Sequence, residues 1–224
     1  MTSLFSRLFN FLFKTHKHFF ILLLFIPWMM VFSLLERITV PQYFLYTWFD
    51  DIIPFVEIMI VPYLFWYLYI IFAFVFLGFT DVDIFKKTCA FVFIGMAVCY
   101  VAYFLFPNGQ NLRPVIIEND IFSCIIKYIY LMDTPTNSAP SIHVINTLAI
   151  HIGLINSKSV STIKGLKGIS FVTAILIILS TMMVKQHSLI DVIYGLLVSL
   201  ILYVAIYNNT YKKEFTEPAD IHIQ

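Results

Sequence analysis

The chain has 224 residues, of which 60% are hydrophobic and 12% charged, with a net charge of +1 and a mean hydropathy of +0.88. A soluble domain carries about twice that fraction of charge, so the composition excludes an ordinary soluble protein and indicates an integral protein of the lipid bilayer. The lysines lie in separate short segments rather than in one stripe, which gives no indication of nucleic acid as a partner.

Six apolar runs are candidates for helices that cross about 30 Å of hydrocarbon. In chain order they cover residues 19–35, 55–78, 88–106, 140–155, 168–184 and 188–207, and the fourth is somewhat short for a span. No internal repeat or linker separates them. The sequence therefore predicts an all-α fold, a six-span transmembrane helical bundle that forms a single domain over residues 1–224.

The longest polar interval, residues 107–139, contains a further helical pattern. Within 119–132, apolar residues recur at helical spacing, at Ile121, Phe122, Ile125, Ile126 and Ile129. This pattern is typical of a short amphipathic helix that lies on the membrane surface.

The distribution of positive charge predicts the orientation of the bundle. With six spans both termini share one side, and that side holds ten of the fourteen Lys and Arg residues, in the terminal segments and in the loops after the second and fourth spans. The other four lie opposite, namely Arg37, Arg113, Lys127 and Lys185. The positive-inside rule therefore predicts cytoplasmic termini, in what we expect to be a cell membrane.

This orientation brings three polar segments to one face of the membrane, outside the cytoplasm. They are Arg113, residues 140–143 and residues 187–191, which are far apart in the sequence but at similar depth in the predicted bundle. Segments at the same depth and on the same face can meet in space, so we expect a shared polar site there.

The stretch 185–191 places a lysine, a histidine and an aspartate between two long apolar runs. If the residues from His187 onward are helical, His187 and Asp191 lie one turn apart on the same face. The carboxylate can then hold one ring nitrogen of the imidazole and leave the other free as a base or nucleophile. A short loop whose polar residues face water is the alternative interpretation.

The fourth span opens with Pro140, Ser141, Ile142 and His143. Proline suits a first helical turn, and the N–H groups of Ser141 and Ile142 would then point outward at the positive end of the helix dipole. Such a helix start suits a phosphate anion, the Ser141 hydroxyl adds a donor, and His143 could protonate a leaving oxygen. An ordinary helix cap with an interfacial histidine is the alternative.

These residues together resemble the type-2 phosphatidic acid phosphatase superfamily, whose pattern is K-x6-R-P, then P-S-G-H, then S-R-x5-H-x3-D. The matching residues are Arg113-Pro114, Pro140-Ser141-Ile142-His143, and Ser180-Thr181 followed after five residues by His187 and after three more by Asp191. The match covers roughly the second half of the chain, with a core at about 88–207. Six spans with the site on the outer face is the usual architecture of that family.

The chain departs from this pattern at three positions. Phe106 stands at the lysine of the first motif, Ile142 at the glycine of the second and Thr181 at the arginine of the third. A phosphoryl group needs its charge balanced, so the two missing cations bear on activity more than the missing glycine does. Lys185 is a candidate substitute. The residues P-S-I-H and K-Q-H-x3-D also look like the branch that contains inositolphosphorylceramide synthases.

The resemblance implies a metal-free, two-step reaction without a cofactor. His187 would attack phosphorus and form a phosphohistidine, with Asp191 fixing its tautomer, and His143 would protonate the leaving alkoxide and then activate water or an acceptor hydroxyl. The implied phosphate-binding groups are Arg113, Ser141, the N–H of Ile142, Lys185 and Ser180. The scattered histidines, carboxylates and cysteines give no independent indication of a bound metal ion.

The expected function is that of a lipid phosphatase that hydrolyses a lipid phosphomonoester or diphosphate, a phosphatidic acid, a phosphatidylglycerophosphate or a polyprenyl diphosphate by resemblance. The first alternative is a phospholipid or sphingolipid headgroup phosphotransferase that uses the same histidines. The second is a transporter or scaffold without enzymatic activity, in which Glu57 and Asp191 are polar residues within the membrane.

Overall fold

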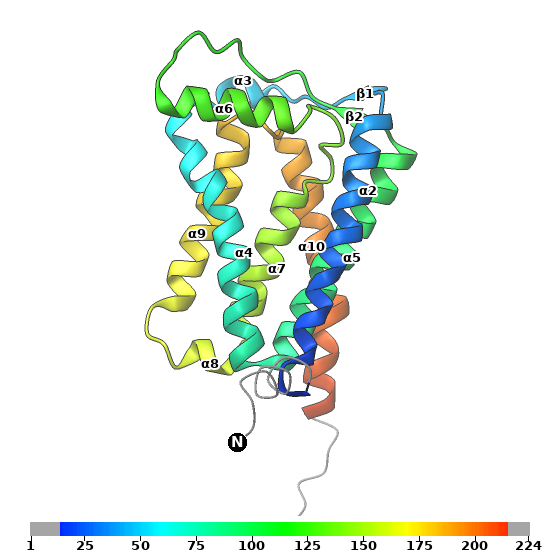
Figure 1. The fold of residues 1–224 in the computed structure, drawn as a ribbon, viewed down its shortest axis with the longest axis vertical. Helices are drawn as coiled ribbons and strands as arrows, with labels where there is room; N and C mark the ends of the chain where they lie inside the picture. Colours follow the sequence, from blue (N-terminus) through cyan, green and yellow to red (C-terminus); the bar gives the residue numbers. More distant parts are fainter. Residues whose placement is uncertain (1–13, 215–224) are drawn as a thin grey trace, which may run out of the picture.

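The structure is a computed structural model that describes residues 14–214, with side chains as far as Tyr207. Arg7 and the side chains of Lys212 and Lys213, which enter the charge argument above, lie outside the described residues. The fold is an all-helical bundle whose long helices run roughly parallel to the vertical axis of Figure 1.

Five helical segments among the described residues are long and apolar enough to cross a membrane: Lys17–Ile38, Glu57–Thr80, Val82–Leu105, Leu166–Met183 and Leu189–Tyr207. The first joins η2 (Lys17–Leu24) to α2 (Phe25–Ile38), and the second joins η3 (Glu57–Met59) to α4 (Ile60–Thr80). The others are α5 (Val82–Leu105), α9 (Leu166–Met183) and α10 (Leu189–Glu214). The predicted all-α fold is therefore confirmed, and the five candidate spans indicate a membrane protein.

Helix α7 (Ile142–Asn156) corresponds to the predicted fourth span, but its 15 residues are fewer than those of the five candidate spans. It packs against α4, α5, α9 and α10 and so occupies the centre of the bundle. Two glycines permit this close packing. A Cβ at Gly153 would lie 2.2 Å from Oγ1 of Thr88 on α5, and one at Gly195 on α10 would lie 2.9 Å from Cβ of Val144. Six spans remain a prediction.

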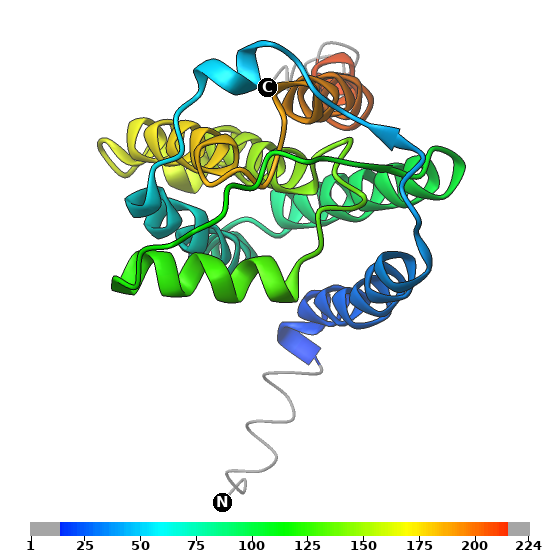
Figure 2. The same cartoon turned by 90° about the horizontal axis from the view of Figure 1, so that it is seen from above.

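Helix α2 packs differently from the other long helices. Only 11% of its most apolar window is buried, against 56% for α5, and its contacts in the bundle are mainly with α5. Viewed from above, α2 stands at the periphery, apart from α4 (Figure 2). Its exposed apolar surface is what a helix in contact with lipid would present.

One end of the bundle carries the short elements, and α8 (Lys158–Ser161) lies at the opposite end (Figure 1). The short elements are α3 (Phe49–Ile52), α6 (Ile121–Met132), β1 (Tyr43–Phe44) and β2 (Asn108–Gly109), and β1 pairs with β2 in parallel. Helices α7 and α10 both begin at this end. The predicted helix within 119–132 is therefore present as α6, capped by Asp120, which accepts from the N–H groups of Phe122 and Ser123.

Two local expectations change in the structure. Helix α5 begins at Val82 rather than near residue 88, because Asp81 accepts from the N–H of Ile84 and caps it. Pro140 lies outside α7, whose N-cap is Ser141.

Candidate active site

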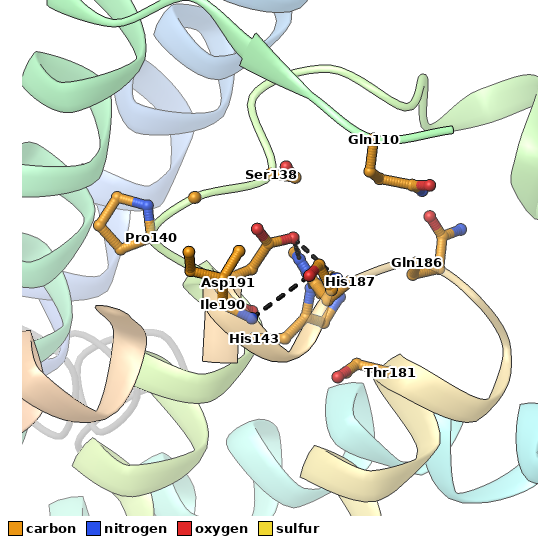
Figure 3. Close-up of polar contacts among 12 residues, drawn as sticks. Gln110, Ser138, Pro140, His143, Thr181, Gln186, His187, Ile190 and Asp191 are labelled. Carbon is orange, nitrogen blue, oxygen red and sulfur yellow. Dashed lines mark hydrogen bonds and ion pairs between the residues drawn. The ribbon is translucent and has the colours of Figure 1, made fainter. Parts of the chain in front are cut away.

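Two histidines, 44 residues apart in the sequence, meet at the end of the bundle that carries the short elements. His143 lies in the first turn of α7, and His187 lies in the turn between α9 and α10. Nδ1 of His143 is 3.2 Å from Nε2 of His187, and Nδ1 of His187 is 3.2 Å from Oδ2 of Asp191 (Figure 3). The expectation that residues 140–143 and 187–191 lie together is therefore met.

The hydrogen bonds assign the tautomer of both imidazoles. A carboxylate only accepts, so Nδ1 of His187 carries the proton that it donates to Asp191, and Nε2 of His187 is left as an acceptor. The Nδ1–H of His143 then donates to this Nε2. In this series of hydrogen bonds from Asp191 through His187 to His143, the basic lone pair on Nε2 of His187 faces the proton on Nδ1 of His143.

Asp191 is buried and its position is fixed by the start of α10. Its Oδ2 also accepts from the N–H of Ser188, and its main-chain carbonyl accepts from the N–H of Ser141 at 3.2 Å. Asp50 of α3, also buried, accepts from the Ser188 hydroxyl and from the N–H of Leu189. Asp50 thus caps α10, a helix far along the chain.

The segment that contains β2 fixes the approach to both histidines. Oδ1 of Asn108 accepts from the N–H groups of Ser138 and Ala139, and its Nδ2 donates to the carbonyl of Ala139. Two residues on, Nε2 of Gln110 donates to the carbonyl of Lys185, two residues before His187. One short stretch therefore holds the loop before α7 and the turn before α10.

The second motif is arranged differently from the expectation. The Ser141 hydroxyl accepts from the N–H of Val144 as the N-cap of α7, and its N–H is bonded to Asp191. Ser141 is fully buried and supports the helix rather than facing the histidines. Ile142 is the first residue of α7, so its N–H has no partner within the helix, and its side chain lines the pocket described below.

Arg113 contacts Gln186, the residue that precedes His187, rather than either histidine. Its guanidinium donates to the carbonyls of Tyr130 and Asp133 and to Oε1 of Gln186, and it stacks over the Tyr130 ring at 4.5 Å. The amide of Gln186 lies beside His187 in the chain and lines the same pocket. Arg113 therefore orients Gln186, a residue that the sequence argument did not select.

Lys185 and Ser180 also have other partners than the expected phosphate. Nζ of Lys185 donates to the carbonyls of Asp50 and Ile53, and burial lowers the pKa of this amine. The Ser180 hydroxyl donates to the carbonyl of Ile177 within α9. Lys185 thus joins the end of α3 to the turn that carries His187. The Ser180 hydroxyl makes its hydrogen bond within α9.

The histidines open onto a pocket of about 670 Å³. Its walls are mainly apolar and aromatic side chains of α2, α4 and α5, and its polar end holds His143, Asn146, Gln186, His187, Asp133 and Glu36. A pocket with apolar walls and a few polar groups at one end suits an amphipathic ligand, since the chain and the head of such a ligand have different environments.

Asp133 is the second residue of the pocket that the sequence argument missed. It follows α6, and burial raises the pKa of its carboxyl to about 6, against the opposing effect of His187 and Arg113, while Glu36 raises it further. An aspartate in a predicted surface loop carries no sequence signal of such an environment. Only the fold of α6 over α4 places it there.

No group of three or more His, Cys, Asp or Glu side chains in the described part of the chain is arranged to hold a metal ion. Comparisons of the chain with known protein families, with curated proteins and with solved structures find no match. The geometry of the site and the resemblance of its motifs are therefore the observations that bear on function.

Proposed function

We propose that this protein is a metal-independent lipid phosphatase, which transfers the phosphoryl group of a lipid phosphate or diphosphate to His187 and then to water. The observation that carries the proposal is the hydrogen-bonded chain of Asp191, His187 and His143 at the polar end of an apolar pocket. A nucleophile, its orienting carboxylate and an acid are the three groups that covalent phosphoryl transfer requires.

In the first step, Nε2 of His187 attacks phosphorus while the bond from phosphorus to the lipid oxygen breaks. His143 acts as the acid in its doubly protonated form: the proton on Nδ1 moves to that oxygen, and His143 becomes neutral with its remaining proton on Nε2. The lipid leaves as an alcohol, or as a lipid monophosphate when the substrate is a diphosphate. The phosphohistidine keeps its proton on Nδ1, where the carboxylate of Asp191 balances the positive charge that develops on the ring.

In the second step, Nδ1 of the now basic His143 takes a proton from water, whose oxygen attacks phosphorus as the bond from phosphorus to nitrogen breaks. Phosphate leaves and both histidines return to their starting states. Two residues that line the pocket would donate to the non-bridging oxygens: Ile142 through its N–H and Gln186 through its Nε2 group. In this proposal the site faces outside the cytoplasm of a cell membrane.

A second candidate is a headgroup transferase, in which an acceptor hydroxyl replaces water in the second step. One observation favours it: the described residues that line the pocket include Asp133 and Glu36 but no lysine or arginine. A phosphomonoester carries a charge of about −1.5 to −2 at neutral pH, whereas a diester carries only one negative charge and is better suited to such a pocket.

The test supplies ³²P-labelled lipid phosphates to the purified full-length protein in lipid nanodiscs. Released phosphate indicates hydrolysis, a new labelled lipid indicates transfer, and label that stays on the protein and is lost in acid indicates phosphohistidine. His187→Ala is expected to abolish all three signals. His151→Asn, which changes a histidine of α7 that bonds Ser170 outside the site, should retain them. Turnover that survives His187→Ala would leave a transporter or scaffold as the better interpretation.

A further inference from the structure

The polar end of the pocket has an unusual charge balance for a phosphate site. Asp133 and Glu36 line it, and Oε1 of Glu36 accepts from both the N–H and the hydroxyl of Thr134, which fixes the carboxylate at the rim. The guanidinium of Arg113 donates to two carbonyls and to Gln186 rather than to either carboxylate. A bound phosphate would therefore lie beside negative charge that the described lining residues do not neutralise.

Aromatic rings of α4 lie beside His143 and line the pocket that also contains these carboxylates. The ring centroids of Trp66 and Tyr63 on α4 lie 4.5 and 5.0 Å from that of His143, and Tyr67 lines the same wall. The faces of such rings attract cations, most strongly where water is excluded. Carboxylates beside aromatic rings are a typical environment for an ammonium group.

Unpartnered polar atoms give a second, independent indication that a ligand occupies this end. Asn137, Asn146 and Gln186 are only 4, 2 and 5% exposed and line the pocket. Among the described residues, both amide atoms of Asn137, Oδ1 of Asn146, Nε2 of Gln186 and Nε1 of Trp66 are buried without a hydrogen-bond partner. Buried polar atoms are rarely left unpaired, so these are groups that a polar ligand would satisfy.

We propose that the pocket recognises a zwitterionic lipid, whose phosphate binds at His143 and His187 and whose ammonium group binds between Asp133, Glu36 and the aromatic rings of α4 that line the pocket. The inference rests on the proposed phosphoryl transfer at the histidines and names the charge of its substrate. The ammonium supplies within the ligand the positive charge that the lining residues lack.

Two sources provide this chemistry. The ammonium group can belong to the part of the lipid that remains after phosphate is removed, as in an amino-alcohol monoester, or to the headgroup of a phosphodiester. The first source fits the phosphatase and the second fits the transferase. The same two carboxylates would bind the ammonium group from either source, so matched pairs of lipids are needed to distinguish the two sources.

The experiment measures binding rather than turnover, with the full-length His187→Ala protein in nanodiscs, so that it does not depend on catalysis. The first pair of probes is sphingosine 1-phosphate and its N-acetyl derivative, which has the same phosphate but no positive charge. The second pair is phosphatidylethanolamine and phosphatidylglycerol. We expect the ammonium-bearing lipid of at least one pair to bind about tenfold more tightly, the effect of one partly solvated cation site.

Adding Asp133→Asn should reduce that preference to about twofold or less, with Glu36→Gln acting in the same direction. Glu118→Gln, which removes a carboxylate from an exposed loop outside the pocket, should leave the preference intact. Equal binding within both pairs, or a preference that survives Asp133→Asn combined with Glu36→Gln, would overturn the inference. Preferential binding by a protein without turnover would instead support the inference and refute the proposed function.

Discussion

His187 uses its two ring nitrogens for different partners, and this division decides which nitrogen can react. Asp191 accepts a hydrogen bond from the Nδ1–H group of His187, so the lone pair of the ring is on Nε2, which accepts a hydrogen bond from His143. A ligand phosphate that reaches Nε2 must therefore displace the hydrogen bond from His143, and the released proton is then directed at the ligand. Under the proposed function, substrate binding and the delivery of the acid are thus coupled at one atom.

Replacing Asp191 with Asn is expected to reverse the tautomer of His187, because an amide can donate to Nδ1 and the proton then resides on Nε2. Turnover of a lipid phosphate should fall by about 10³- to 10⁴-fold, as expected when an imidazole base is held in the wrong tautomer. The measurement is kcat in nanodiscs, together with thermal unfolding to establish that the variant is folded. Asp83→Asn at the opposite end of the bundle is the matched control, and a similar loss there would contradict this role.

Asp133 predicts a dependence of stability on pH. Its carboxyl has a pKa of about 6 in the folded protein, raised from 3.8 mainly by burial, so the folded state binds the proton more tightly than the unfolded state does. The stabilisation is present below about pH 4 and is lost as the pH rises through 6. Unfolding temperatures of the wild type should decrease, relative to those of Asp133→Asn, between pH 4 and 7. Parallel curves for the two proteins would contradict the raised pKa.

The sequence identified some of these residues and missed others for physical reasons. His143 and His187 could be paired because helix topology fixes the side of the membrane on which each lies. Gln186 and Asp133 could not be selected, since an amide and a carboxylate in polar loops look the same whether they face water or a pocket. Arg113 was found, but its partners depend on the loop geometry that a linear pattern does not contain.

Two short segments position α7 and α10 relative to each other. Asn108 and Gln110 bond the loop before α7 and the turn before α10, and the Lys185 side chain ties that turn to α3. Lys185 itself has a φ of 53°, the left-handed conformation at the end of α9 that glycine usually adopts. The N–H groups of Gln186 and His187 then bond the carbonyl of Thr181 and close the helix end.

Asn108→Leu tests this arrangement, because leucine has a similar size and no hydrogen-bonding groups. The N–H groups of Ser138 and Ala139 lose their acceptor while still buried, which should cost about 2–4 kcal/mol of unfolding free energy. Thermal or urea unfolding in detergent measures this loss, and turnover should fall as well because His143 follows the same loop. Asn111→Leu changes an exposed asparagine of the same segment and should do neither. An unchanged stability for Asn108→Leu would show that the loop is held by other contacts.

Helix boundaries were less predictable than helix existence. The apolar runs identified each long helix, because a bilayer requires continuous apolar sequence, and helical spacing identified α6. The start of α5 was misplaced by about six residues since Asp81 caps it through a bond that hydropathy does not register. The capping of α10 by Asp50 links residues that are 139 positions apart, so no local pattern could indicate it.

Considered as a whole, the molecule combines a tightly packed part with a loosely packed one. Helix α7 is enclosed by α4, α5, α9 and α10, whereas α2 stands at the edge and contributes one wall of the pocket. The rigid part carries the histidines, and the pocket wall formed by α2 and α4 is suited to contact the chains of a lipid. Binding of the chain and chemistry at the head are therefore separable by mutation.

Ile70→Trp places a larger side chain in the wall that α4 contributes to the pocket, away from the histidines. We expect kcat/KM for a long-chain lipid phosphate to fall about tenfold, because overpacking typically costs 1–3 kcal/mol, while hydrolysis of soluble p-nitrophenyl phosphate stays within about twofold. Leu68→Trp, on the exposed face of the same helix, should leave both activities unchanged. Equal losses on the two substrates would indicate damage to the site rather than to the chain-binding wall.

The peripheral position of α2 has a final consequence. A helix that buries so few of its side chains depends on its surroundings to hold it against the rest of the protein, and in a bilayer these surroundings are acyl chains. The width of the pocket would then depend on the surrounding lipid as well as on the protein, and it would vary with the thickness and fluidity of the membrane. Under the proposed function, the protein would respond to the physical state of its bilayer through the position of α2.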